Sequence, residues 1–167
     1  VLLVSLAGLA TAANTWVGGW KTIGDIDDAG RLLLYPTSVA ISYHNNVYVT
    51  DTTGINYIMK LPSGGSWTSL GTHGNSPIAV VADSWDDVFV LNSGIGTSGM
   101  VYKYVNNSYN ADYGKWIDIT NSNNPSNPTQ QFYNPRDIAV DNPGNVYVIN
   151  EVIIDGKDHW EIIESPS

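Results

Sequence analysis

Three histidines are the side chains of this 167-residue chain best suited to proton transfer or metal binding. His44 falls in a predicted turn, His73 comes just before an apolar run, and His159 falls in a predicted loop. These are different positions of the repeat described below, so the histidines share no common ligand pattern. We therefore predict no catalytic residue and no metal site, unless His44 and His73 meet acids across neighbouring repeats.

Clustered acids are the second candidate for chemistry, because carboxylate oxygens bind calcium. Asp25, Asp27 and Asp28 are close together, but Pro36 stands where the closing glutamate of an EF-hand loop would be. The acidic pair at 86–87 is interpreted as part of a turn. No phosphate-binding loop or Ser-His-Asp order stands out. We predict no cofactor, with calcium at the first cluster as the alternative.

Tryptophans recur along the chain, and each is followed three positions later by an aliphatic residue: Trp20 and Ile23, Trp67 and Leu70, Trp116 and Ile119. Each pair is typical of a short strand. A row of tryptophans is suited to carbohydrate binding, but large aromatic side chains more often pack between neighbouring sheets. Packing is the interpretation that we favour.

These side chains must be positioned by a repeated pattern of short apolar runs. Each copy begins at a proline, and a second run begins eleven residues later: Pro36 and Val47, Pro77 and Val88, Pro135 and Val146. Third runs follow at 57–61, 100–104 and 160–164, and the tryptophan segments supply a fourth. Turn residues separate the runs and no helical period is present, which predicts four-stranded antiparallel sheets. The first run, at 39–41, is predicted to be buried on both faces.

The pattern Pro-x-x-Val-Ala-Ile, then Asn-Val-Tyr-Val-Thr-Asp, then Ile-Met-Lys-Leu resembles the NHL repeat, and residues 135–148 match it best. The resemblance implies an all-β β-propeller, in which each four-stranded antiparallel repeat is one blade around a central channel. With strands named a to d from the centre outward, the chain reads d-abcd-abcd-abc, about three blades in residues 16–167. Some relatives of this fold are lyases or hydrolases that hold a metal at the channel mouth.

Charge and composition restrict the partners and the compartment. A net charge of −9 argues against nucleic acid, and the absence of cysteine excludes disulfides and Cys-ligated zinc. Residues 1–15 form an apolar segment that resembles a secretory signal, with a cleavage-like site at 10–12. A buried assembly element is the alternative. The segment is too short to span a bilayer, so we predict no membrane span in the mature chain. From its resemblance to a secretory signal we predict a secreted or cell-surface protein.

Three blades are too few to close a ring, so uncovered blade faces and a free strand edge are expected. We predict a non-catalytic exported structural protein that binds copies of itself through blade faces and strand complementation, as a ring or a filament, unless the chain is part of a longer propeller. The predicted assembly residues are Trp16, Trp20, Ile23, Trp160, Ile162 and Ile163. A protein- or glycan-binding propeller module is the first alternative, and a metal-dependent lyase or hydrolase of the propeller type is the second.

Overall fold

The computed structural model describes residues 23, 33, 35–52, 57–73, 76–93, 99–120 and 132–165, and this part contains strands and no helix. Sheet 1 has the order β1 (Pro36–Ile41), β2 (Val47–Asp51), β3 (Tyr57–Leu61), β4 (Thr68–Thr72). Sheet 2 has the order β5 (Pro77–Ala82), β6 (Val88–Asn92), β7 (Met100–Tyr104), β8 (Trp116–Asp118). Sheet 3 has the order β9 (Asn134–Val140), β10 (Val146–Ile154), β11 (Lys157–Ser165). All pairings between these strands are antiparallel.

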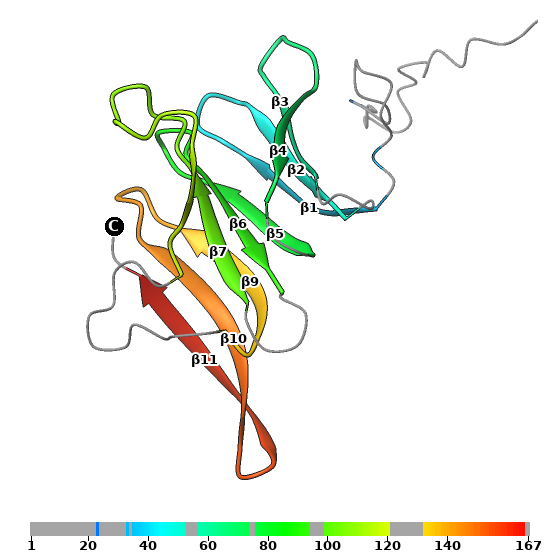
Figure 1. The fold of residues 1–167 in the computed structure, drawn as a ribbon, viewed down its shortest axis with the longest axis vertical. Coiled ribbons are helices and arrows are strands. Elements are labelled where there is room, and N and C mark those ends of the chain that lie inside the picture. Colours follow the sequence, from blue (N-terminus) through cyan, green and yellow to red (C-terminus); the bar gives the residue numbers. More distant parts are fainter. Residues whose placement is uncertain are drawn as a thin grey trace, which may run out of the picture.

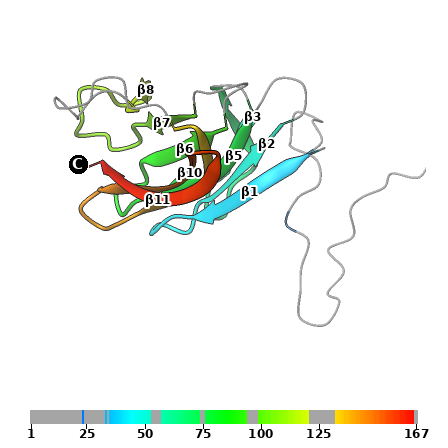
Figure 2. The ribbon, with the colours of Figure 1, turned by 90° about the horizontal axis from the view of Figure 1, so that it is seen from below.

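The three sheets lie side by side, with sheet 2 between the other two (Figures 1 and 2). Their first strands form the shared inner edge, because β1 contacts β5 and β5 contacts β9. The later strands of each sheet lie progressively farther from that edge (Figure 1). The predicted repeat is therefore confirmed as one antiparallel sheet per copy, with the strands in sequence order.

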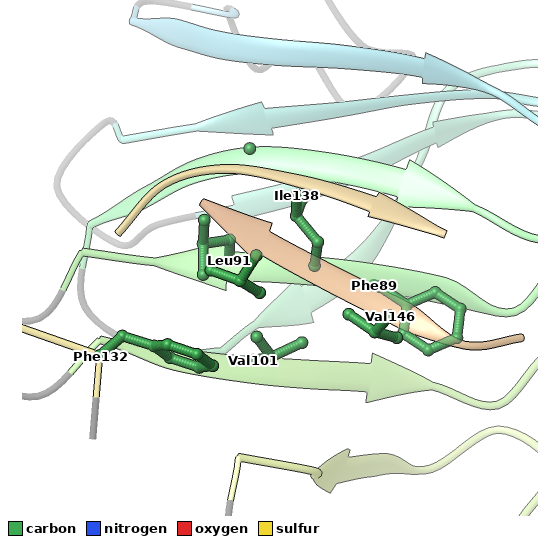
Figure 3. Packing of buried hydrophobic residues seen from close by; sticks show 8 residues of the cluster. Phe89, Leu91, Val101, Phe132, Ile138 and Val146 are labelled. Atoms are coloured by element: carbon green, nitrogen blue, oxygen red, sulfur yellow. The ribbon is translucent and has the colours of Figure 1, made fainter. Parts of the chain in front are cut away.

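Apolar side chains between the sheets hold them together. Figure 3 shows the cluster between sheets 2 and 3, where Phe89 and Leu91 of β6 meet Val146 of β10 and Ile138 of β9. A second cluster, between sheets 1 and 2, contains Tyr48, Ile58, Val80, Val88 and Val90. Each Å² of apolar surface that these clusters remove from water stabilises the folded state by roughly 25 cal/mol. Packing between sheets is therefore the main force that fixes their order.

The first strand of sheet 1 departs from the prediction, because β1 is not buried on both faces. Val39 and Ile41 are 65% and 66% exposed, whereas the alternate residue Ala40 packs against the cluster between sheets 1 and 2. Among the described strands, β1 has a neighbouring sheet on one face only, so its other side chains face the open side, whereas β5 lies between β1 and β9. The predicted apolar run is correct, but its burial on both faces is wrong.

The third sheet extends farther than the apolar pattern indicated. β10 continues to Ile154 and β11 begins at Lys157, so the two strands form a long hairpin (Figure 1). His159 lies within β11, opposite Val152, instead of in a loop. Trp160 lies in the third strand of its sheet, as predicted. The apolar periodicity predicted a loop for the polar residues around His159, but cross-strand pairing holds these residues in the hairpin.

Several sequence-based predictions lie outside the described residues. These are the apolar segment 1–15, Trp16, Trp20, the acids at 25–28 and the polar connector 121–131. Within the described strands and loops, no helix is long and apolar enough to cross a membrane.

Candidate functional site

Three turns connect the first and second strands of the sheets and lie at the same end of the molecule; we call residues 42–46, 83–87 and 141–145 the inner turns. A backbone hydrogen bond closes each one, for example from Asp83 N to Asp87 O at 3.1 Å. The fourth residue of each turn is left-handed: Asn45 (φ 60°), Asp86 (φ 64°) and Gly144 (φ 98°). Asparagine, aspartate and glycine tolerate this conformation better than other residues. Only the second turn therefore places a carboxylate at this position.

This carboxylate reaches across the boundary between sheets 1 and 2. Nδ1 of His44 lies 3.1 Å from Oδ2 of Asp86, and Nδ2 of Asn46 donates a hydrogen bond of 2.7 Å to the same oxygen. The side chain of His44 is 60% exposed and that of Asp86 is 8% exposed. A buried acid thus holds one nitrogen of an accessible imidazole. The other nitrogen, Nε2, remains available to a ligand or a water molecule.

The histidine and the acid border a cleft of about 410 Å³. Its remaining lining residues are Trp85, Asn106, Asn107, Ser108 and Tyr109. Trp85 and Tyr109 are exposed, as is Tyr43, whose ring lies edge-on to His44 at 5.4 Å between centroids. The cleft therefore combines aromatic surfaces with neutral amide and hydroxyl groups, and no lysine or arginine lines it.

The loop that forms the far wall of the cleft is held by Asp87, the residue after the paired acid. Oδ1 of Asp87 accepts hydrogen bonds from the backbone nitrogens of Asn106 and Asn107 at 2.7 and 2.9 Å. Its Oδ2 lies 2.9 Å from Nζ of Lys103 in β7. Because hydrogen bonds to charged groups are among the stronger ones, this acid fixes the loop that carries Ser108 and Tyr109. Asp86 thus bonds the side chains of the first inner turn, whereas Asp87 holds the loop at 106–107.

The acids that begin the second and third inner turns differ in their electrostatics. Burial raises the pKa of Asp83, although hydrogen bonds from the backbone nitrogens of Trp85 and Asp87 oppose the shift. Desolvation also acts to raise the pKa of Asp141, but hydrogen bonds from Asn145, Tyr147 and Gly144 outweigh it and the pKa is lowered. Hydrogen bonds to the charged form explain the difference.

The alternative in which His44 and His73 meet across neighbouring repeats is not seen in the structure. Thr72, the residue before His73, pairs with Tyr57 at the end of sheet 1 opposite the inner turns. The ring of His73 instead stacks on Trp116 at 4.7 Å, and burial lowers its pKa. No group of three metal-ligating side chains gathers among the residues that the structure describes. The side chains present do not fit a metal centre, and we derive no step through one.

The predicted assembly residues fall in different environments. Ile23 is exposed, and its carbonyl oxygen accepts a hydrogen bond of 3.2 Å from Nε1 of Trp67. Trp160 and Ile162 are exposed in sheet 3, whereas Ile163 packs against the cluster between sheets 2 and 3. The packing prediction for the tryptophan row is confirmed at Trp67, which is buried in its own cluster.

Comparison with known proteins gives information on the fold only through solved structures. No family model matches the chain, and no curated protein is similar to it. Among solved structures, an X-ray structure described as a candidate gluconolactonase is similar, with a TM-score of 0.55 and 15% sequence identity. The match covers 89% of this chain and 54% of the other, so the chain spans about half the length of that structure. The neighbour is a six-bladed propeller.

The chain has a propeller-type fold. The all-β prediction is thus confirmed. The prediction of a non-catalytic assembly protein that is not an enzyme is wrong by the same comparison, because the neighbour is described as a hydrolytic enzyme. Counting uncovered blade faces had favoured assembly, but such faces say nothing about the chemistry at the turns. The second alternative, a propeller hydrolase, is taken up as a proposal below.

The sequence interpretation missed the partner of His44. Asp86 was read as a turn residue, which it is, but its side chain pairs with a residue of the neighbouring turn. A signal was present, because the other two copies have Asn45 and Gly144 at the same turn position. An acid at a left-handed position costs conformational energy that asparagine or glycine would reduce.

Proposed function

We propose that this propeller is a hydrolase whose general base is His44, oriented by Asp86. The observation that carries the proposal is the 3.1 Å contact between His44 Nδ1 and Asp86 Oδ2 at the edge of a cleft. A carboxylate at Nδ1 favours the tautomer with its proton on that nitrogen, which leaves Nε2 as the proton acceptor. Fold alone does not determine activity, so the support comes from this pair.

The reaction is the addition of water to an ester carbonyl. Nε2 of His44 removes a proton from a water molecule in the cleft as its oxygen attacks the carbonyl carbon. The negative charge of the tetrahedral intermediate falls on the former carbonyl oxygen, where the side-chain amides at 106 and 107 and the hydroxyl of Ser108 are the available donors. Collapse of the intermediate breaks the bond to the leaving oxygen. The imidazolium returns the proton to that oxygen, which gives a carboxylic acid and an alcohol.

The lining of the cleft favours a neutral, hydroxyl-bearing ring as substrate. Trp85 and Tyr109 offer flat aromatic surfaces, and the polar residues around them are amides and hydroxyls. Since no cationic side chain lines the cleft, phosphorylated or carboxylated substrates lack a partner there. A cyclic sugar ester, or lactone, meets these requirements, and it is also the substrate class named for the structural neighbour.

The test is hydrolysis of glucono-1,5-lactone and of a neutral aryl ester by the purified chain, followed by titration of the released acid. We expect His44→Gln to lower kcat by about 10²-fold to 10⁴-fold, the range for a lost general base. His159→Gln is the matched control, because that histidine lies in β11 away from the cleft. Full activity in His44→Gln, or no hydrolysis of either substrate by the unaltered chain, would overturn the proposal.

The second candidate function is carbohydrate binding without catalysis. The exposed aromatic side chains of Tyr43, Trp85 and Tyr109 lie on or beside the first two inner turns, and flat aromatic surfaces are suited to binding sugar rings. Calorimetric titration with neutral oligosaccharides tests it. Binding that Tyr109→Ala weakens, without any turnover, would favour this candidate over the hydrolase.

Two finer proposals rest on the sequence. We propose that the blades are of the NHL type, on the strength of the pattern in residues 135–148, and that the chain is secreted or displayed at the cell surface, on the signal-like segment 1–15. The predicted absence of a cofactor, the alternative of calcium near Asp25 and the association of the chain with itself stay predictions.

A further inference from the structure

One position of the repeat carries an aromatic side chain in all three sheets: Tyr48, Phe89 and Tyr147. In sheet 3, the hydroxyl of Tyr147 donates to Asp141, the acid that begins the inner turn, at 3.3 Å, and also approaches Glu164 at 3.2 Å. The tyrosine hydroxyl therefore bonds the acid of its own turn. In sheet 2 the tyrosine is replaced by phenylalanine, and no such bond is possible.

Sheet 1 keeps the tyrosine but has lost the acid, since Ser42 begins its inner turn. Tyr48 is fully buried, at 0% exposure, in the cluster between sheets 1 and 2. Its hydroxyl makes no hydrogen bond of good geometry with any described residue, and neither do the hydroxyl of Ser42 and Oδ1 of Asp86. Buried polar atoms without a protein partner usually bond an ordered water molecule. The three atoms therefore indicate a position for such a water.

Hydrogen bonds around Asn46 place these groups at the boundary between the first two inner turns. Ser42 N donates to the carbonyl oxygen of Asn46 at 3.0 Å, and the side chain of Asn46 donates to Oδ2 of Asp86 at 2.7 Å. Burial is the main cause that raises the pKa of Tyr48, and the negative charge of Asp86 raises it further. The hydroxyl of Tyr48 thus keeps its proton at neutral pH and is able to donate a hydrogen bond.

We propose that Tyr48 is a positioning residue of the candidate active site, whose hydroxyl donates a hydrogen bond to one bridging water that in turn donates to Oδ1 of Asp86. The proposal rests on the proposed function, since it extends the His44–Asp86 pair. With Asn46 and His44 on Oδ2 and Tyr48 on Oδ1 through this water, both oxygens of the acid are held. A fully satisfied buried network keeps one geometry, whereas a half-satisfied one does not.

The three copies differ at the first position of the inner turn. Tyr147 bonds Asp141 of its own turn, whereas Tyr48 has Ser42 at the equivalent place. The hydroxyl of Tyr48 is therefore not engaged by an acid of its own turn. Phe89 has no hydroxyl to compete for Asp83, which instead caps its own turn through Trp85 N and Asp87 N.

The test is the tautomer of the His44 imidazole, measured from its ¹⁵N chemical shifts at pH 8 in labelled full-length protein. This measurement needs no substrate, so it stands even if the hydrolase proposal fails. We expect mainly the Nδ1–H form in the unaltered chain. Tyr48→Phe, which removes only the hydroxyl, is expected to lower the Nδ1–H fraction measurably and, if the chain is a hydrolase, to lower kcat several-fold with KM unchanged.

Two further variants distinguish positioning from a general loss of structure. Tyr147→Phe removes the equivalent hydroxyl in sheet 3 and is expected to leave the His44 spectrum unchanged. In an Asp86→Ala background, Tyr48→Phe is expected to have no additional effect on the tautomer, because its target is gone. The proposal is overturned if Tyr48→Phe leaves the tautomer unchanged, or if it changes it equally with and without Asp86.

Discussion

Nε1 of Trp116 in β8 donates a hydrogen bond of 3.0 Å to the carbonyl oxygen of Leu70 in β4, and this bond joins the outer strands of two sheets. Trp67 makes the corresponding bond to Ile23 at 3.2 Å. In both cases the acceptor is the aliphatic residue three positions after the tryptophan of the preceding copy. The recurring Trp-x-x-aliphatic pattern therefore encodes a contact between neighbouring repeats and not within one strand.

Replacing Trp116 by phenylalanine tests this contact. The variant loses one hydrogen bond and part of the stacking on His73. We expect the free energy of unfolding to fall by about 1–3 kcal/mol, measured by urea denaturation. Trp160→Phe, an exposed tryptophan, is the control and should change it by less than about 0.5 kcal/mol. Equal effects of the two substitutions would show that the contact between sheets contributes nothing.

Asp86→Gly is expected to separate stability from activity. Glycine adopts φ 64° without strain, which offsets part of the loss of the hydrogen bond from Asn46, so the free energy of unfolding should fall by less than about 1 kcal/mol. Loss of the acid leaves His44 without its partner, and kcat should fall at least tenfold, to about 10⁻¹ or less of its value. Thermal unfolding and lactone hydrolysis are measured on the same preparation. A variant that keeps full kcat would remove Asp86 from the mechanism.

The stability of the chain is expected to depend on pH through the buried acid Asp83. Its pKa is raised by burial, so its contribution to stability is present at low pH and is lost as pH rises through the folded-state value. Asp83→Asn keeps an oxygen that accepts from Trp85 N and Asp87 N. We expect this variant to gain stability relative to the unaltered chain between about pH 4 and pH 7.

Asp83→Ala is the matched variant, because it removes the acceptor together with the charge. It should destabilise the chain at every pH by about 1–2 kcal/mol, since two turn hydrogen bonds are lost. The measurement is the urea midpoint of both variants and of the unaltered chain at pH 4 and pH 7. If Asp83→Asn is less stable than the unaltered chain at pH 7, the ionised carboxylate is stabilising and the argument from burial is wrong.

For His73 we expect the opposite dependence of stability on pH. Burial lowers its pKa, so its contribution to stability is complete above about pH 6.5, the unfolded value, and is lost as pH falls toward the folded value. His73→Phe keeps an aromatic ring against Trp116 but cannot be protonated. The unaltered chain should therefore lose more stability than the variant between pH 7.5 and pH 5. Parallel losses in the two proteins would contradict this.

A side chain at position 99 is expected to clash with its neighbours beside the cluster between sheets 2 and 3. A Cβ atom at this position would overlap the ring of Pro135 and lie 2.9 Å from Cβ of Phe132. Neither group can move freely, because Phe132 is buried and Pro135 begins the inner edge of sheet 3. We expect Gly99→Ala to lower the free energy of unfolding by about 1–3 kcal/mol. Gly71→Ala, where a Cβ meets no atom, controls for crowding but carries backbone strain at φ 98°.

Much of the fold could be predicted from the sequence because its signals are local. Runs such as 57–61 and 100–104 alternate between two faces, and the turns between them contain asparagine, aspartate or glycine. The limits of β3 and β7 match those runs. The long hairpin of β10 and β11 was underestimated, because its polar residues are held in strands by pairing with one another.

The candidate site could not be predicted in the same way. His44 and Asp86 belong to turns of different sheets, and Asn46 bonds Asp86 across 40 positions of the chain. Sequence patterning places each residue in a turn, but it does not determine which turns lie next to each other or how far their side chains reach. For the same reason the function predicted from unclosed blades was wrong.

The sequence by itself determined most of the strands and their order within each sheet, because apolar periodicity and turn preferences act over a few residues. Only the tertiary structure decided that the imidazole of His44 meets the carboxylate of Asp86. Burial of Val88, Val90 and Tyr48 between sheets 1 and 2 sets the separation of the two inner turns. That separation brings groups far apart in the chain within 3.1 Å of each other, and it depends on packing between sheets that a local sequence pattern does not specify.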